Sequence, residues 1–104
     1  MKVVLGNCPE YLAQTMASTL VTEQLAACVT LLPGAVSWYR WKGELCKDAH
    51  SMLLIKASDH QLPALHKRYS ALHPDDVPEF VTLAVDEALS DPRYVEWVAG
   101  QRSS

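Results

Sequence analysis

The sequence predicts an α+β domain whose elements follow the order β-α-β-β-α-β, with one further short helix near the C-terminal end. Three observations support this fold class: two segments with apolar residues at helical spacing, short β-branched runs beside them, and a turn signal at Lys42-Gly43 between two apolar arms. With 104 residues, of which 49% are hydrophobic, the chain is expected to form a single domain over residues 1–104.

The first strand is expected to lead directly into the first helix. Residues 3–5, Val-Val-Leu, form a short apolar and β-branched run of the kind found in strands. Cys8-Pro9-Glu10 then indicates a helix start, with proline at the first helical position and an acid in the first turn. The apolar face of this helix should cover a sheet and comprises Leu12, Ala13, Met16, Ala17, Leu20 and Val21.

A long hairpin is predicted next. Its first arm begins near Ala26 and is interrupted by Pro33-Gly34. Because proline is tolerated in sheets mainly at edges and bulges, we expect a bulged strand with an exposed edge. Lys42-Gly43 closes the hairpin, residues 51–56 supply the apolar return arm, and Cys46 is placed in a polar loop between the two arms.

Three aromatic residues, Trp38, Tyr39 and Trp41, gather at the end of the first arm. Aromatic side chains carry a large apolar area that gains from burial, and aromatic rings on a hairpin are more often packing or interface anchors than ligand platforms. We therefore expect a partner surface at this hairpin. Stacking of the rings on a small ligand is the alternative.

The second helix has a start signal and a stop signal. Ser58 and Gln61 fit a capping box, and Pro63 is acceptable because it lies close to the first turn. His73-Pro74 ends the helix, since the residue before a proline avoids the helical conformation. The apolar residues of this helix recur at spacings of three and four and are Leu62, Leu65, Tyr69 and Leu72.

Residues 80–85 predict a fourth strand, and Asp91-Pro92 repeats the cap-then-proline signal before a final helix. The apolar side of that helix consists of Tyr94, Trp97 and Val98. The element order matches the ferredoxin-like split β-α-β unit, in which an antiparallel four-stranded sheet carries both main helices on one face. The other face stays uncovered unless another subunit packs on it.

Composition and charge narrow the range of functions. A net charge of −3 without a basic cluster argues against nucleic acid as a partner. No apolar stretch approaches the roughly 18 to 20 residues of a membrane span, and the first apolar run is too short for a signal peptide. Three scattered cysteines make neither a disulfide framework nor a metal-binding Cys-x-x-Cys motif. We expect a cytoplasmic protein with reduced thiols.

Potential metal ligands cluster around the end of the second helix. His73 offers an imidazole, and Asp75, Asp76 and Glu79 add carboxylates within six residues. Together with the Cys8 thiolate, such a set could hold a divalent transition metal ion, because imidazole, thiolate and carboxylate are its usual ligands. The metal site predicted from these residues consists of His73, Cys8 and Glu79.

Structural roles compete with this interpretation. His73 could instead cap the end of its helix, and Cys8 could be a small buried apolar residue at the strand end. An enzyme that uses Cys8 as a nucleophile would need a base, and no histidine lies close to it in sequence. Three further histidines, His50, His60 and His66, lack ligand spacing and are expected at the surface.

Seven short segments match one known family in order over nearly the whole chain. They include Leu-Ala-Ala-Cys-Val at 25–29, Tyr-Arg-Trp-Lys-Gly-Glu at 39–44 and Tyr-Val-Glu-Trp at 94–97, and the others are 32–34, 54–56, 72–74 and 77–79. On these segments the chain resembles the CutA family of divalent-cation-tolerance proteins. The resemblance implies a ferredoxin-like subunit in a tight homotrimer, similar in architecture to the PII signalling proteins, with long hairpins that pair with neighbouring sheets.

The resemblance also implies a function. It implies a non-enzymatic protein involved in the response to divalent metal ions, with copper as a possible ligand. In some members a first-strand cysteine and two consecutive histidines before the proline are associated with copper, whereas the equivalent positions here are Gly6, Leu72 and His73. An aromatic residue that often follows the His-Pro pair is replaced by Asp75. The alternative is a PII-like sensor that binds a small anionic metabolite in clefts between subunits.

Overall fold

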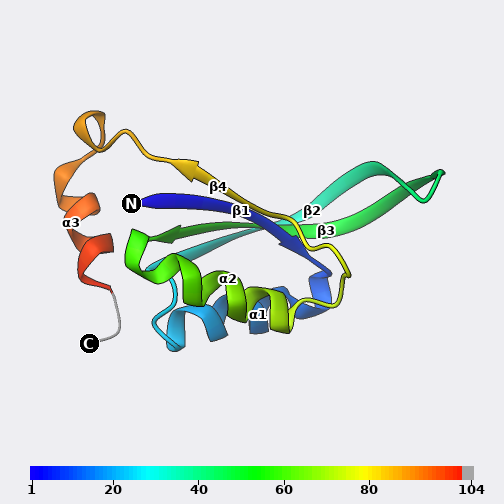
Figure 1. Cartoon of the computed structure of the whole chain (residues 1–104), viewed down its shortest axis with the longest axis horizontal. Helices are drawn as coiled ribbons and strands as arrows, with labels where there is room; N and C mark the ends of the chain where they lie inside the picture. The colour runs from blue at the N-terminus through cyan, green and yellow to red at the C-terminus, as the bar shows by residue number, and fades with distance from the viewer. Residues whose placement is uncertain (102–104) are drawn as a thin grey trace.

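The computed structural model describes residues 1–101, which form a four-stranded antiparallel sheet with the strand order β2-β3-β1-β4. This order and the helices beside it confirm the predicted α+β ferredoxin-like fold (Figure 1). Two short 3-10 turns, Asp59–Gln61 and Glu87–Leu89, precede α2 and α3. The strands and helices are β1 Lys2–Cys8, α1 Glu10–Thr22, β2 Cys28–Trp41, β3 Glu44–Ala57, α2 Leu62–Leu72, β4 Phe80–Ala84 and α3 Pro92–Gly100.

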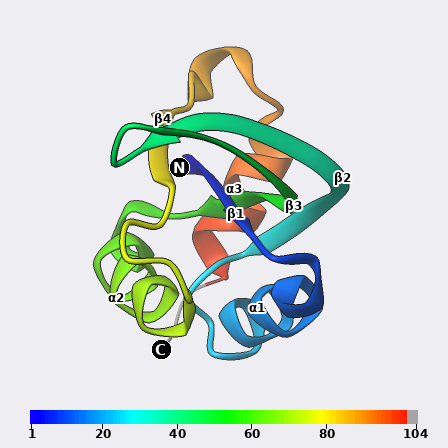
Figure 2. The same ribbon diagram turned by 90° about the vertical axis from the view of Figure 1, so that its right-hand side faces the viewer.

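Helices α1 and α2 lie side by side on one face of the sheet, and α3 lies at the end of the sheet away from the hairpin tip (Figures 1 and 2). The core between helices and sheet is formed mainly by fully buried residues of both layers, among them Val4, Met16, Leu20, Leu53, Ile55, Leu65 and Tyr69. Val21, predicted on the apolar face of α1, is instead 40% exposed. The buried stripe of α1 is therefore narrower than the sequence pattern suggested.

The helix boundaries follow the predicted signals with one difference. The capping box of Ser58 and Gln61 is present, and α2 ends directly before His73. Proline 9 caps α1 instead of occupying its first turn. The reason is that β1 continues to Cys8, which pairs with Ser51 of β3, so the helix cannot begin before Glu10.

The hairpin is longer than predicted. Lys42 and Gly43 adopt φ values of 50° and 83°, which is the two-residue turn that matches the twist of antiparallel strands. The return arm begins at Glu44, not at residue 51. Cys46 therefore lies in β3, opposite Tyr39, and its predicted place in a loop is wrong. Local apolar content failed as a signal here because this part of the arm projects beyond the helices and needs no buried side chains.

The predicted bulge and exposed edge of β2 are both present. The pairing register of β2 with β3 shifts between Leu32 and Ala35, around Pro33-Gly34, and β2 is an edge strand. Gly34 adopts a φ of 77°, and its N–H donates a 2.7 Å hydrogen bond to the Glu10 carboxylate. The bulge is thus tied to the first turn of α1.

The sheet face opposite the helices stays uncovered in the single chain. Three apolar side chains on this face remain exposed to water: Leu32 is 49% exposed, Val81 46% and Leu83 44%. An antiparallel sheet with one solvated face usually carries polar residues on that face. Both edge strands, β2 and β4, also have one free side. Among residues 1–101, no helix is long and apolar enough to cross a membrane.

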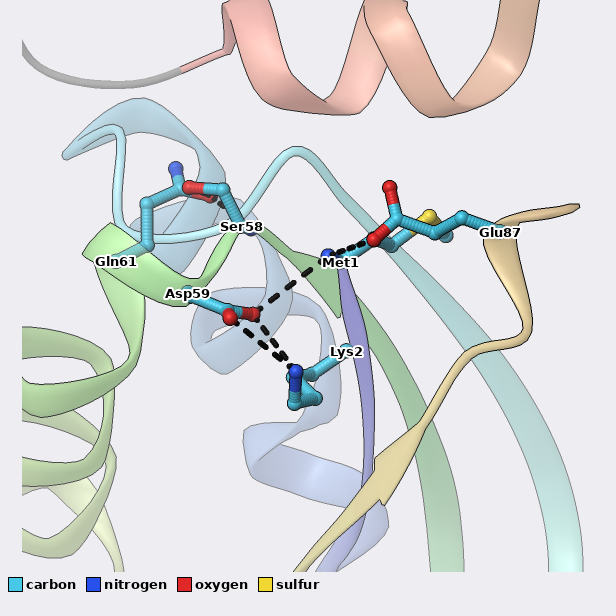
Figure 3. A network of polar contacts seen from close by, with 6 residues as sticks. All are labelled: Met1, Lys2, Ser58, Asp59, Gln61 and Glu87. Atoms are coloured by element: carbon cyan, nitrogen blue, oxygen red, sulfur yellow. Dashed lines mark hydrogen bonds and ion pairs between the residues drawn. The ribbon is translucent and has the colours of Figure 1, made fainter. Parts of the chain in front are cut away.

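A polar network fastens the start of β1 to two neighbouring segments (Figure 3). The Lys2 ammonium lies 3.0 Å from the Asp59 carboxylate, and the Met1 amino group lies 3.4 Å from Glu87. Gln61 nearby accepts a hydrogen bond from the Ser58 N–H at 2.9 Å. The network positions the turn that introduces α2 against the first strand.

Candidate functional site

A cleft of about 440 Å³ opens at the root of the hairpin. It is bordered by the hairpin strands β2 and β3, by the end of β1, and by the loop between α2 and β4. In Figure 1 this loop rises at the same end of the sheet from which the hairpin projects. The lining residues are Asn7, Tyr39, Trp41, Asp48, His50, Pro74, Asp75, Asp76, Val77 and Glu79.

Strand alternation explains why hairpin residues line the cleft. Asp48 and His50 are two residues apart on β3, and Tyr39 and Trp41 are two apart on β2, so each pair points to one face. Trp38, the third aromatic residue of the arm, points to the opposite face, where Lys47 Nζ lies 5.2 Å from its ring. The three aromatic residues therefore do not form one surface.

His50 is the most enclosed polar group of the cleft. It is only 7% exposed, which contradicts the surface position expected from sequence, because the end of β1 and the loop before β4 border the same cleft. Its Nδ1 atom is buried and has no hydrogen-bond partner among residues 1–101. A buried polar atom without a partner is uncommon, because its desolvation is uncompensated.

Asp48 and Tyr39 join the two hairpin strands within the cleft. The Tyr39 hydroxyl donates a short hydrogen bond to the Asp48 carboxylate. This bond, with the negative charge of Asp48, raises the pKa of Tyr39 to about 12. The tyrosine therefore stays protonated at neutral pH and cannot serve as a general base there.

Tyr69 of α2 and His73, the residue that follows this helix, complete the edge of β1 beneath the cleft. Pairing of β4 with β1 stops at Gly6, so the backbone groups of Asn7 have no β4 partner. The Tyr69 hydroxyl accepts from the Asn7 N–H at 3.1 Å, and His73 Nε2 lies 2.7 Å from the Asn7 carbonyl oxygen. The Tyr69 hydroxyl also lies 2.8 Å from the Glu79 carbonyl oxygen. These two side chains replace the missing strand.

The predicted metal ligands do not come together. His73 uses both ring nitrogens, since Nδ1 accepts the Asp75 N–H at 3.1 Å. Cys8 is fully buried, and burial raises the pKa of its thiol, which disfavours the thiolate that a metal requires. Only Glu79 lines the cleft. Among residues 1–101 no three His, Cys, Asp or Glu side chains are placed to hold one ion.

Gly6, the position that corresponds to the first-strand cysteine of some CutA proteins, also has no room for a metal-binding side chain. At Gly6, an added Cβ would lie 2.7 Å from the Tyr69 hydroxyl oxygen and 3.1 Å from its ring carbon Cζ. Any side chain at Gly6 would therefore displace Tyr69 from its hydrogen bonds. The hydrogen bonds of Tyr69 and His73 with Asn7 therefore occupy the place that the resemblance associates with copper ligands.

The charge of the cleft is its main chemical property. Four carboxylates line it, from Asp48, Asp75, Asp76 and Glu79, and no lysine or arginine of residues 1–101 does so. A concave surface lined by one sign of charge focuses the electrostatic potential and raises the local concentration of counter-ions. The cleft is thus suited to a cationic ligand.

The sequence analysis named several residues of this site but did not bring them together. Of its charged and aromatic members, Glu79, Asp75 and Asp76 were proposed as metal ligands, and Tyr39 and Trp41 were considered for stacking on a ligand. Asp48 and His50 were not connected with them. Their period-two spacing would have been a signal if the return arm had been extended to Glu44.

Comparisons with known proteins agree on one family. The family described as "CutA1 divalent ion tolerance protein" matches residues 2–101. The "Divalent-cation tolerance protein CutA" of Thermus thermophilus is 45% identical over 98 residues, which is 93% of each chain. These relatives are named as tolerance proteins and not as enzymes.

Solved structures give the same result. The "PII-like protein CutA" from Nostoc sp. PCC 7120 superposes with a TM-score of 0.94 at 39% identity, covering 99% of this chain and 98% of the other. CutA from Xylella fastidiosa gives a TM-score of 0.92 at 37% identity, covering 98% and 97%.

Proposed function

This chain belongs to the CutA1 divalent ion tolerance protein family, and on that basis we propose that it is a non-enzymatic homotrimer that takes part in the tolerance of divalent cations. We further propose that the acidic cleft is its cation-binding site. The observation that carries this second proposal is the lining of four carboxylates without a lysine or arginine among residues 1–101. All three cysteines are free, which suits the reducing cytoplasm as its compartment.

The uncovered sheet supports the trimer. Leu32, Val81 and Leu83 leave an apolar face without a cover in the single chain, and both edge strands can accept further pairing. Trp41, at the end of the hairpin arm, is also 43% exposed. Burial of these groups between three copies would remove them from water, which is the main favourable term in association.

Copper fits the described residues poorly. A copper ion would take up imidazole and thiolate ligands, but His73 is hydrogen-bonded through both nitrogens and Cys8 is buried with its pKa raised. The predicted site of Cys8, His73 and Glu79 would need His73 to release Asn7 and Asp75. Copper binding at these residues stays a prediction.

Titration with Zn²⁺ and Cu²⁺, in competition with a chelator, tests the cation site. The variant Asp75→Asn/Asp76→Asn removes two cleft charges, and His73→Ala removes the imidazole, with His60→Ala as the exposed-histidine control. We expect the double aspartate variant to weaken metal binding at least tenfold, about 1.4 kcal/mol, and His60→Ala to leave it unchanged. Equal small effects in all variants would mean adventitious surface binding and would contradict the proposal.

Sedimentation in dilute solution tests the assembly. The trimer predicts a mass three times the 11.5 kDa of the chain. A chain that sediments as a monomer would refute the proposed assembly independently of the metal titration.

A further inference from the structure

The carboxylates of the cleft border it from two sides. Asp48 comes from strand β3 of the hairpin, whereas Asp75, Asp76 and Glu79 come from the loop before β4. Within residues 1–101 they do not form a group of three that could hold one ion together with His or Cys. A protein-bound metal ion is usually held by three or more protein ligand atoms at roughly 2.0 to 2.6 Å. This distribution of charge suits a ligand whose positive charge is also spread out.

The cleft offers a hydrogen-bonding group without a partner in addition to its charge. His50 lines the cleft on the same strand face as Asp48 and is 7% exposed. Its Nδ1 atom has no hydrogen-bond partner among the described residues. An N–H group of a ligand that reaches this atom would supply the missing hydrogen bond.

Two aromatic rings complete the lining. Tyr39 is 39% exposed and Trp41 is 43% exposed, and both border the cleft. Aromatic faces attract organic cations, and they also pack against hydrocarbon chains. The Lys42 ammonium group already lies 5.9 Å from the centroid of the Trp41 ring. The volume of about 440 Å³ lies in the range of clefts that bind small molecules.

We propose that the ligand of this cleft is a small organic cation with at least two amine or guanidinium groups. One cationic group pairs with Asp48 of the hairpin, and the other pairs with the carboxylates of Asp75 and Asp76. The hydrocarbon part lies against the ring of Tyr39. This inference rests on the proposed function, because both assume that the cleft binds a cation. The two differ in the class of cation, which is a metal ion in the proposed function and an organic amine here.

Calorimetric titration of the whole chain with 1,4-diaminobutane tests the inference. 1,4-Butanediol, which is neutral, and succinate, which is a dianion, serve as controls with the same carbon chain length. Zn²⁺ is titrated in parallel. The variant Asp75→Asn/Asp76→Asn removes two cleft carboxylates, and Asp86→Asn/Glu96→Gln removes two exposed carboxylates outside the cleft as a charge-matched control.

We expect the diamine to bind the wild type and the charge-matched control with affinities within a factor of two. The cleft variant should bind it at least tenfold more weakly, and neither diol nor succinate should bind. Melting curves of both variants verify that they are folded.

Three results would overturn the inference. Equal weakening in both double variants would mean that the diamine responds only to net charge. Zn²⁺ binding that depends on the cleft, without diamine binding, would reject the organic cation and leave the proposed cation site intact. Absence of both ligands from the cleft would reject the inference and the proposed cation site together.

Discussion

Replacement of Tyr69 by phenylalanine tests how side chains complete the edge of β1. The Tyr69 hydroxyl accepts the Asn7 N–H at 3.1 Å and lies 2.8 Å from the Glu79 carbonyl oxygen. In Tyr69→Phe the ring stays in the core but these hydrogen bonds are lost. The Asn7 N–H has no substitute partner, because β4 pairs with β1 only as far as Gly6.

The expected loss of stability follows from those two bonds. A buried donor left without a partner costs about 1 to 3 kcal/mol. The hydroxyl's own proton faces the carbonyl oxygens of Glu79 at 2.8 Å and Asn7 at 2.9 Å, and loss of this donated bond adds about 1 kcal/mol. Tyr69→Phe should therefore lower the free energy of unfolding by about 2 to 4 kcal/mol. The size of the tyrosine ring is conserved, so no cavity contribution is expected.

Urea denaturation at one fixed protein concentration measures this difference, since the stability of an oligomer depends on concentration. Tyr11→Phe is the matched control, because Tyr11 is 81% exposed. A loss in Tyr69→Phe no larger than in Tyr11→Phe would refute the role of the hydroxyl.

The same pair of proteins has an expected pH dependence. Burial raises the pKa of Tyr69 above its ordinary value of 10.0, so the folded protein holds this proton more tightly than the unfolded chain. Stability from this group is complete below pH 10 and falls as the pH rises above it. The advantage of the wild type over Tyr69→Phe should narrow above pH 10, and a constant difference would contradict the assignment.

Three further perturbations have expected outcomes. Trp41→Ala should increase dissociation of the trimer on dilution, measured by sedimentation, and an unchanged dissociation constant would place the ring outside the interface. Asp91→Ala should lower stability by about 1 kcal/mol, because its carboxylate accepts the Arg93 N–H at 2.9 Å and caps α3; unchanged urea unfolding would contradict this role. A thiol reagent should modify Cys46 in the folded protein well before the fully buried Cys8, and equal rates of modification would contradict the described burial.

Local signals explain why much of the fold was predictable. The turn at Lys42-Gly43 needs positive φ values, and the two residues have them. The capping box needs Ser58 and Gln61 three residues apart, and the bulge follows from a proline inside a strand. Each of these signals depends on residues close together in the chain, so the local conformation that it specifies does not depend on tertiary contacts.

The same reasoning failed where packing decides. Val21 fits the apolar period of α1 but lies outside the buried stripe, and His50 lacks any apolar neighbour pattern but is enclosed. Cys46 was assigned to a loop because the hairpin tip buries little, although the backbone pairing of β2 and β3 continues there. In each case the deciding factor is a surface that another segment covers or leaves open.

The sequence by itself determined the order of the elements, the hairpin turn, the bulge and the family, because these depend on local conformation and on patterns within short segments. Only the tertiary structure decided the site. Antiparallel pairing of β1 with both β3 and β4 brings Asn7, the hairpin residues and the loop at 74–79 to one cleft, although they are up to 72 positions apart, from Asn7 to Glu79. The tertiary structure also places His73 in a hydrogen bond with Asn7 and buries Cys8. Distances between such remote residues depend on pairing register and burial, which no local spacing specifies.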